Sequence, residues 1–408
     1  MKRSEDRILT THAGSLVRTP GIIRAMKALD EGKPYDEQTY REDLRNGVAD
    51  VVQRQAEAGI DVVSDGEYGK RGWSQYVIER FTGLEPERRE ELRTFMDRGP
   101  RDSGFVDFWS RYRKLETVIW LPEPAFGDAV KAGKLGPGLP QTAWVCTGPV
   151  TYRGHDAVAR DIENFKAALG AADVVEAFMP VVAPCSAEVT RENRYYDSEE
   201  DYLSAVATAL SEEYRAIVNA GLLLQVDDAH LPMRFSAMAA QGRADEWERW
   251  AAMRVDALNA ALEGIPSDRV RYHICWGSQN APHLDDAPLR VVINQVMRVN
   301  ADAYVIESAN PRHEHEWTVW EDVKLPPGKT LIAGVVSHAT NIVEHPDLIA
   351  TRLERFARAL GRENVMAGTD CGFSQNWNLI RVHPSVQWAK LEALAQGAEI
   401  ASRRLWGG

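Results

Sequence analysis

A repeated alternation of short strand-like runs with longer helical segments constrains the fold more than any other feature of the sequence. Each run is rich in aliphatic and β-branched residues and ends in polar ones. Between Ile349 and Leu360, apolar side chains recur every three or four residues, which places them on one helical face. We interpret nine runs as strands, at residues 8–15, 61–67, 143–149, 181–185, 222–228, 270–276, 303–308, 331–337 and 364–371.

Repeated strand–helix units predict right-handed crossovers and a parallel sheet. About eight such units favour an α/β fold of the (β/α)8 TIM-barrel type, so we expect one of the nine runs to lie outside the barrel. No internal repeat or low-complexity linker divides the 408 residues, which predicts a single barrel domain over residues 1–408. Residues 73–141 fit no strand–helix unit. They predict an insertion after the second strand, over the carboxyl-terminal face or in the contact of a homo-oligomer.

Composition excludes several classes of function. Acidic residues outnumber basic ones by 60 to 48, giving a net charge of −12, which disfavours nucleic-acid binding. No apolar run approaches the roughly 18–20 residues of a membrane span, and the charged start lacks a secretory apolar region. We therefore expect a cytoplasmic protein, whose thiols stay reduced. Four cysteines are too few for a disulfide framework, so metal binding or nucleophilic chemistry is expected of them.

Polar side chains gather where the predicted strands end. In barrels of this type the carboxyl ends of the strands carry the active site, so this pattern predicts an enzyme. The residues concerned are His12, Ser15, Asp65, Glu67, Asp227, Asp228, His273, Cys275, Glu307, His338, Asp370 and Cys371.

Four of these residues form a candidate metal site. His273 and Cys275 are two positions apart on one predicted strand, so both side chains point to the same face. Glu307 and Cys371 follow at the ends of later strands. Two thiolates, an imidazole and a carboxylate suit Zn²⁺ in tetrahedral geometry. From spacing alone, the alternative is that small buried cysteines pack as apolar side chains.

These residues lie in segments that resemble the zinc-binding segments of cobalamin-independent methionine synthase: HIC at 273–275, VIES at 305–308 and TDCG at 369–372. Further segments resemble the same family in the same order: TTHAGSL at 10–16, DGE at 65–67, TGPV at 147–150 and LQVDD at 224–228. The full-length synthases carry two barrels, and the resemblance covers only the catalytic, C-terminal one. EAFMP at 176–180, ANPRHEHEW at 309–317 and VEHP at 343–346 are more similar to the short single-barrel branch, which includes epoxyalkane:coenzyme M transferases.

The resemblance implies a zinc-dependent alkyltransferase, methyltransferase-like, with a small-molecule thiol and an alkyl donor as partners. Zinc would bind the substrate thiol as a thiolate, which then attacks an alkyl carbon. Glu307 would be the ligand that this thiol displaces from the metal. Glu67 and Asp227 would bind the amine of an amino-acid thiol such as homocysteine, and Ser15 its carboxylate. The alternative for these acids is helix capping or pairing with an arginine.

Two further histidine features have a chemical and a structural interpretation. His338 is, with Asp227, a candidate catalytic residue, because it lies where an acid can protonate a leaving group. The alternative is a structural histidine at a strand end, whose ring nitrogens are hydrogen-bonded within the fold. His313 and His315 form a second His-x-His pair, for which a structural or substrate-orienting role is favoured over a second metal site because no thiol accompanies it.

The chain also departs from the synthases. Tyr152 and Arg153 follow TGPV where the synthases place a tryptophan that stacks on folate, so folate stacking is not expected. Residues 181–188, including Cys185, are additional relative to the synthases. We therefore expect the run at 181–185 to be the one outside the barrel.

Three other functions compete with the methyltransferase. Thiol addition to an epoxide, as in the coenzyme M branch, requires cations for a sulfonate. A metal-free barrel lyase of the uroporphyrinogen decarboxylase type predicts no bound zinc, and a non-catalytic thiol or zinc carrier predicts zinc without turnover. The candidate cations for the sulfonate are Arg18, Arg71, Arg312 and Arg381.

Overall fold

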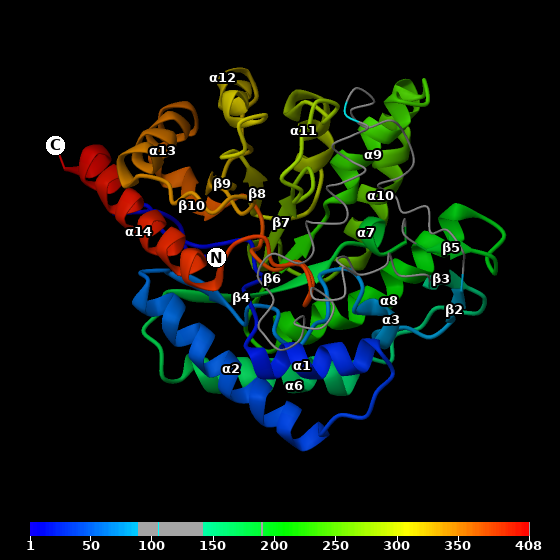
Figure 1. The fold of residues 1–408 in the computed structure, drawn as a ribbon. Helices are drawn as coiled ribbons and strands as arrows, with labels where there is room; N and C mark the ends of the chain where they lie inside the picture. Colours follow the sequence, from blue (N-terminus) through cyan, green and yellow to red (C-terminus); the bar gives the residue numbers. More distant parts are fainter. Residues whose placement is uncertain (89–104, 106–141, 189–190, 408) are drawn as a thin grey trace.

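The computed structural model describes residues 1–88, 105, 142–188 and 191–407. Its centre is a seven-stranded sheet in the order β1-β4-β6-β7-β8-β9-β10, in which every neighbouring pair is parallel (Figure 1). The strands are β1 (Val62–Ser64), β4 (Glu176–Val182), β6 (Leu223–Asp227), β7 (Val270–Ile274), β8 (Ala303–Glu307), β9 (Thr330–Val336) and β10 (Val365–Thr369).

The N-terminal segment lies between the two edge strands of this sheet. Thr10 bridges to Ala367 of β10, and Thr11 bridges to Val62 of β1, both in parallel. The strand expected at residues 8–15 is thus reduced to two bridges, because the chain turns away at Gly14, whose φ of +123° favours glycine. The predicted barrel is confirmed in part, as a mixed α/β fold with a parallel sheet, and a complete (β/α)8 barrel is not established.

The strands carry mostly apolar side chains on both faces, as expected for a parallel sheet that is covered on each side. β6, β7, β8, β9 and β10 are buried along their whole length. One apolar cluster takes side chains from six of the seven strands and from the N-terminal segment. Its buried members are Leu9, Val62, Phe178, Leu223, Ala303, Val305, Ile332 and Met366.

Arg271 of β7 is fully buried against this cluster. Its guanidinium lies 3.7 Å from the centroid of the Phe178 ring and donates to Thr11 Oγ1 and to the His12 carbonyl, each at 3.0 Å. The charge therefore has an aromatic face and two oxygen acceptors, which compensate for its loss of hydration. The two hydrogen bonds from Arg271 thus link the N-terminal segment to β7.

Helices surround the sheet (Figure 1). Some of their contacts are charged and buried: Arg80 of α3 bonds Asp161 of α6 and Glu213 of α8, each at 2.6 Å. The helices are α1 (Pro20–Asp30), α2 (Glu37–Glu57), α3 (Val77–Arg80), α6 (His155–Leu169), α7 (Pro184–Glu188), α8 (Glu199–Asn219), α9 (His230–Ala239), α10 (Trp247–Ala261), α11 (Leu289–Met297), α12 (Val319–Asp322), α13 (Pro346–Leu360) and α14 (Pro384–Trp406). None of the described helices is both long and apolar enough to cross a membrane.

A second, three-stranded sheet lies apart from the first, in the order β2 (Leu84–Arg88), β3 (Thr142–Cys146) and β5 (Glu192–Asn193) (Figure 1). The expectation that the run at 181–185 is the one outside the main sheet is wrong. β4 ends within that run and pairs with both β1 and β6. β3 overlaps the predicted run at 143–149 and pairs antiparallel with β2. Of the predicted insertion, residues 89–104 and 106–141 lie outside the described residues.

Candidate metal centre

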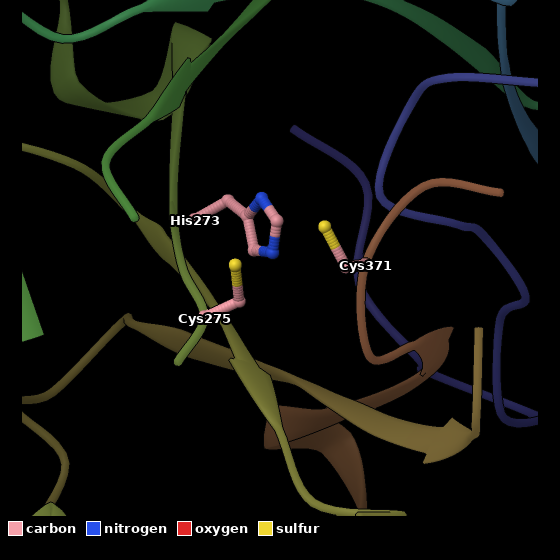
Figure 2. A group of neighbouring side chains, drawn as sticks. All are labelled: His273, Cys275 and Cys371. Atoms are coloured by element: carbon pink, nitrogen blue, oxygen red, sulfur yellow. The ribbon is translucent and has the colours of Figure 1, made fainter. Parts of the chain in front are cut away.

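Three of the four predicted metal ligands come together at the carboxyl ends of the strands. His273 is on β7, Cys275 follows the end of that strand, and Cys371 follows β10. Their ligand atoms all lie within 4.8 Å of one another, and all three residues are buried. Figure 2 shows His273 and Cys275 extending from one strand toward Cys371. The two-residue spacing accounts for the first pair, because alternate residues of a strand share a face.

Asp227 holds the imidazole of His273 in place. It is the neighbour of His273 in the β6–β7 register, and its Oδ1 lies 3.0 Å from His273 Nδ1. Burial disfavours the imidazolium, but the hydrogen bond to Asp227 and the nearby Cys371 charge outweigh it and raise the pKa of His273 to about 9. A carboxylate on the outer nitrogen is the usual partner of a metal-binding histidine. The sequence predicted Asp227 as a substrate ligand and missed this contact.

The two cysteines differ in protonation. Cys275 donates a hydrogen bond to Cys371, and this bond, with help from the His273 charge, lowers the pKa of Cys371 to about 6 despite burial. The same bond, burial and the charge of Glu307 raise the pKa of Cys275 well above its usual value. Ser278 Oγ lies 3.5 Å from Cys371 Sγ and can donate to it. Cys371 is therefore the more acidic of the two thiols.

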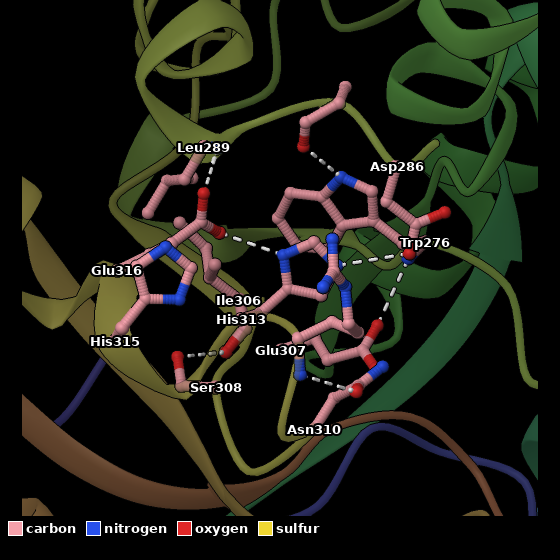
Figure 3. Close-up of polar contacts among 12 residues, drawn as sticks. Trp276, Asp286, Leu289, Ile306, Glu307, Ser308, Asn310, His313, His315 and Glu316 are labelled. Carbon is pink, nitrogen blue, oxygen red and sulfur yellow. Dashed lines mark hydrogen bonds and ion pairs between the residues drawn. The ribbon is translucent and has the colours of Figure 1, made fainter. Parts of the chain in front are cut away.

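Glu307, the predicted fourth ligand, falls in a second group of three with His338 and Asp370. Its carboxylate accepts from the main-chain nitrogen of Trp276 at 3.0 Å and from Asn310 Nδ2 at 2.9 Å (Figure 3). Its charge nevertheless raises the pKa of Cys275, so the two groups adjoin. Asp370 is among the polar residues that the sequence places at strand ends, but the sequence analysis assigned it no role.

The predicted substrate residues lie on the N-terminal side of the same region. Glu67 is buried with a φ of +59°, and burial, together with the charge of Asp227, raises its pKa to about 8. Ser15 packs against Gly372, directly after Cys371: a Cβ added there would lie 2.0 Å from Ser15 Oγ. Both residues therefore lie close to the metal-ligand candidates.

The four candidate arginines have different surroundings. Arg18 is buried and donates to main-chain carbonyls and a serine hydroxyl. Arg71 pairs with two carboxylates, and Arg312 is exposed and bonds the loop after β7. Arg381 is buried, and its charge acts on His338. Two of the four arginines therefore place their charge on a candidate site residue, Arg381 on His338 and Arg18 on Glu67.

The pair His313 and His315 does not converge. His313 is buried between Glu316 Oε2 at 2.8 Å and Asp286 Oδ2 at 3.1 Å, and it stacks on Trp276 with 4.1 Å between ring centroids (Figure 3). His315 is exposed. Both nitrogens of His313 are therefore occupied by carboxylates, which agrees with the structural interpretation of the pair.

Fold and site together define a parallel α/β protein with a buried thiol–imidazole cluster at the carboxyl ends of its strands. Residues 189–390 match the family model described as the catalytic domain of cobalamin-independent synthase, and the chain belongs to that family.

Named relatives support this assignment. The chain is 22% identical to 2-hydroxypropyl-CoM lyase of Xanthobacter autotrophicus, over 90% of this chain and 87% of that one. It is also 22% identical to 5-methyltetrahydropteroyltriglutamate–homocysteine methyltransferase of Thermotoga petrophila, over 93% of this chain but only 43% of that protein. The solved B12-independent methionine synthase of Shewanella sp. W3-18-1 has a similar fold, with a TM-score of 0.69 at 19% identity, covering 98% of this chain and 100% of that chain.

Proposed function

We propose that this protein is a zinc-dependent alkyltransferase that acts on a thiol. His273, Cys275 and Cys371 would hold the metal, with Glu307 at or near the fourth position. The observation that carries the proposal is the approach of two sulfurs and one imidazole nitrogen to within 4.8 Å in a buried cluster. Sulfur and imidazole are the ligands that zinc favours, so the residues present fit this metal.

Bound zinc would deprotonate a substrate thiol near neutral pH and so make it a nucleophile. The residues of the chain supply the setting for that chemistry. Asp227 engages Nδ1 of His273, so Nε2, which lies 3.2 Å from the Asp370 carbonyl, would be the nitrogen for the metal. Burial of the cluster excludes water, which would compete with the thiol for an alkyl group.

The proposed substrate residues are Ser15, Glu67 and Asp227, with His338 as the proposed acid for the leaving group. Glu67 and Asp227 are buried carboxylates whose charges act on each other. A protonated amine between them would relieve that repulsion, which favours an amino-acid thiol such as homocysteine. We further propose that residues 1–408 form one barrel domain, closed through residues 10–11, with residues 73–141 as its insertion.

A second candidate is the addition of a thiol such as coenzyme M to an epoxide. The observation that favours it is buried Arg381, which donates to Gln375 Oε1 at 2.7 Å and whose charge acts on His338. A guanidinium in this place can pair with a sulfonate. In that reaction the thiolate opens the ring at carbon, and the alkoxide formed takes a proton.

The test begins with metal analysis of protein expressed with ample zinc. We expect one zinc per chain, lost in Cys275→Ser and in Cys371→Ser. Cys146→Ser is the matched control, because Cys146 is buried in the three-stranded sheet. Zinc-free wild-type protein would contradict the proposal and favour the metal-free lyase.

The second part identifies the thiol. Cobalt would replace zinc, and homocysteine or coenzyme M would be added while sulfur-to-cobalt absorption is recorded. We expect one of these thiols to raise that absorption and to be alkylated when a methyl donor or an epoxide is supplied. A protein that binds zinc but does not respond to either thiol would be a carrier, and the alkyltransferase proposal would be wrong.

A further inference from the structure

A second polar group lies beside the thiol–imidazole cluster. It consists of Glu307 at the end of β8, His338 after β9 and Asp370 after β10. One ligand atom from each residue lies within 4.8 Å of the others, and the three residues are only 0–2% exposed. Three neighbouring strands thus bring two carboxylates and an imidazole to one buried place.

The hydrogen bonds of this group are incomplete. Asp370 Oδ1 accepts from the main-chain nitrogens of Ser308 and Ala309, both at 2.8 Å. Asp370 Oδ2 and both ring nitrogens of His338 have no hydrogen-bond partner among the described residues. Buried polar atoms are nearly always bonded, and leaving one unpaired is costly. The group therefore has three atoms available for a ligand.

Two of the cations near the group are paired with carboxylates outside it, and a third, Arg381, donates to Gln375. Lys390 bonds Glu344 at 2.7 Å, and Arg352 bonds Glu314 at 3.0 Å. The group itself brings two buried carboxylates, those of Glu307 and Asp370, within 4.8 Å of each other. Two carboxylates held this close in a buried region repel each other when charged, and a cation between them would relieve that repulsion.

We propose that Glu307, His338 and Asp370 form a second cation site that binds a divalent metal. One imidazole and two carboxylates suit Mn²⁺, Fe²⁺ or Zn²⁺, whereas the thiol–imidazole cluster selects zinc through its sulfur ligands. Each oxygen of Glu307 keeps a free lone pair beside the hydrogen bond it accepts, so this carboxylate can also serve a metal in the first cluster. Adjacent two-metal sites of this kind occur in many enzymes.

The two sites can be tested separately because their ligands differ. Protein loaded with one equivalent of Zn²⁺ would be titrated with Mn²⁺, and free Mn²⁺ would be followed by electron paramagnetic resonance. We expect one bound Mn²⁺ per chain in the wild type. Cys371→Ser should lose zinc and still bind Mn²⁺, so failure of the proposed zinc site would not be mistaken for failure of the second.

Two variants probe the second site directly. His338→Gln and Asp370→Asn should each weaken Mn²⁺ binding by about tenfold or more. Asp370→Asn keeps the Oδ1 acceptor for both main-chain nitrogens, so it preserves the local fold. His345→Gln is the control, because His345 lies in the same connection but is exposed.

Two results would overturn the proposal. One is wild-type protein that holds zinc but binds no Mn²⁺. The other is Mn²⁺ binding that is equally tight in His338→Gln and in the wild type.

Discussion

Asp227→Asn tests how the fold prepares His273 for a metal. The carboxylate accepts from His273 Nδ1 at 3.0 Å and from Gln225 Nε2 at 2.9 Å. An asparagine oxygen can still accept both bonds, so the substitution removes the charge and little else. A hydrogen bond to a charged group contributes about 1.5–3 kcal/mol and a neutral one about 1 kcal/mol. The expected loss is therefore about 0.5–2 kcal/mol, or roughly two- to thirtyfold in zinc affinity.

The assay is competition between the protein and a chromophoric chelator for zinc. Asp228→Asn is the matched control, because its side chain accepts from Ser186 at 2.7 Å and from Tyr272 at 2.9 Å instead of from His273. The control should bind zinc as the wild type does. Equal zinc affinity of wild type and Asp227→Asn, within about twofold, would refute the positioning role.

The same variant also distinguishes the two thiols. With zinc saturating, Asp227→Asn should raise the KM for homocysteine, because the amine loses a charge-assisted hydrogen bond. Coenzyme M has no amine, so its KM should change little. Unchanged activity with homocysteine would count against the amino-acid substrate and favour the coenzyme M-like one.

Three further outcomes are expected. Near neutral pH, zinc should release about two protons on binding, one from His273, whose pKa is about 9, and one from Cys275, whose pKa is well above its usual value. The zinc affinity should therefore rise with pH, more steeply below about pH 9 than above it, where only Cys275 still carries a proton. Calorimetry in buffers of different ionisation enthalpy would show this, and no proton release would contradict it. Arg80→Met should lower the free energy of unfolding in urea by about 3–5 kcal/mol, because two buried carboxylates lose their partner; a loss below about 1 kcal/mol would contradict the expectation. Gly372→Ala should lower kcat/KM while zinc is retained, because the new Cβ would lie 2.0 Å from the hydroxyl of Ser15. Gly170→Ala is the control, because the nearest atom to its new Cβ lies at 3.6 Å, and it should have no effect. Equal kcat/KM in the two variants would contradict the reasoning.

The approach of His273, Cys275 and Cys371 follows from rules that can be applied to sequence. Alternate residues of a strand share a face, and the carboxyl ends of parallel strands meet at one edge of a sheet. These rules depend only on strand positions. They cannot say which rotamer a side chain adopts, and so they could not show that Glu307 joins His338 and Asp370.

Sheet membership was harder to predict than strand formation. The runs at 143–149 and 181–185 are both apolar and both end in polar or small residues, so their local patterns are equivalent. The difference lies in their partners: β3 pairs antiparallel with β2, whereas β4 lies between β1 and β6. Strand preference reflects packing against neighbours more than the strand itself, and those neighbours are distant in sequence.

The position of the N-terminal segment between β1 and β10 has a consequence for biosynthesis. Ala13 donates from its main chain to Thr369 Oγ1, 356 positions further along the chain. A ribosome synthesises the protein from its N-terminus. This segment can therefore form its contacts with β10 only after the residues up to that strand have been synthesised. The apolar residues that it covers are exposed during that time, and contacts of such long sequence separation slow folding. We therefore expect the nascent protein to depend on chaperones until β10 has emerged, and Ser15 to reach its place beside Gly372 among the last steps.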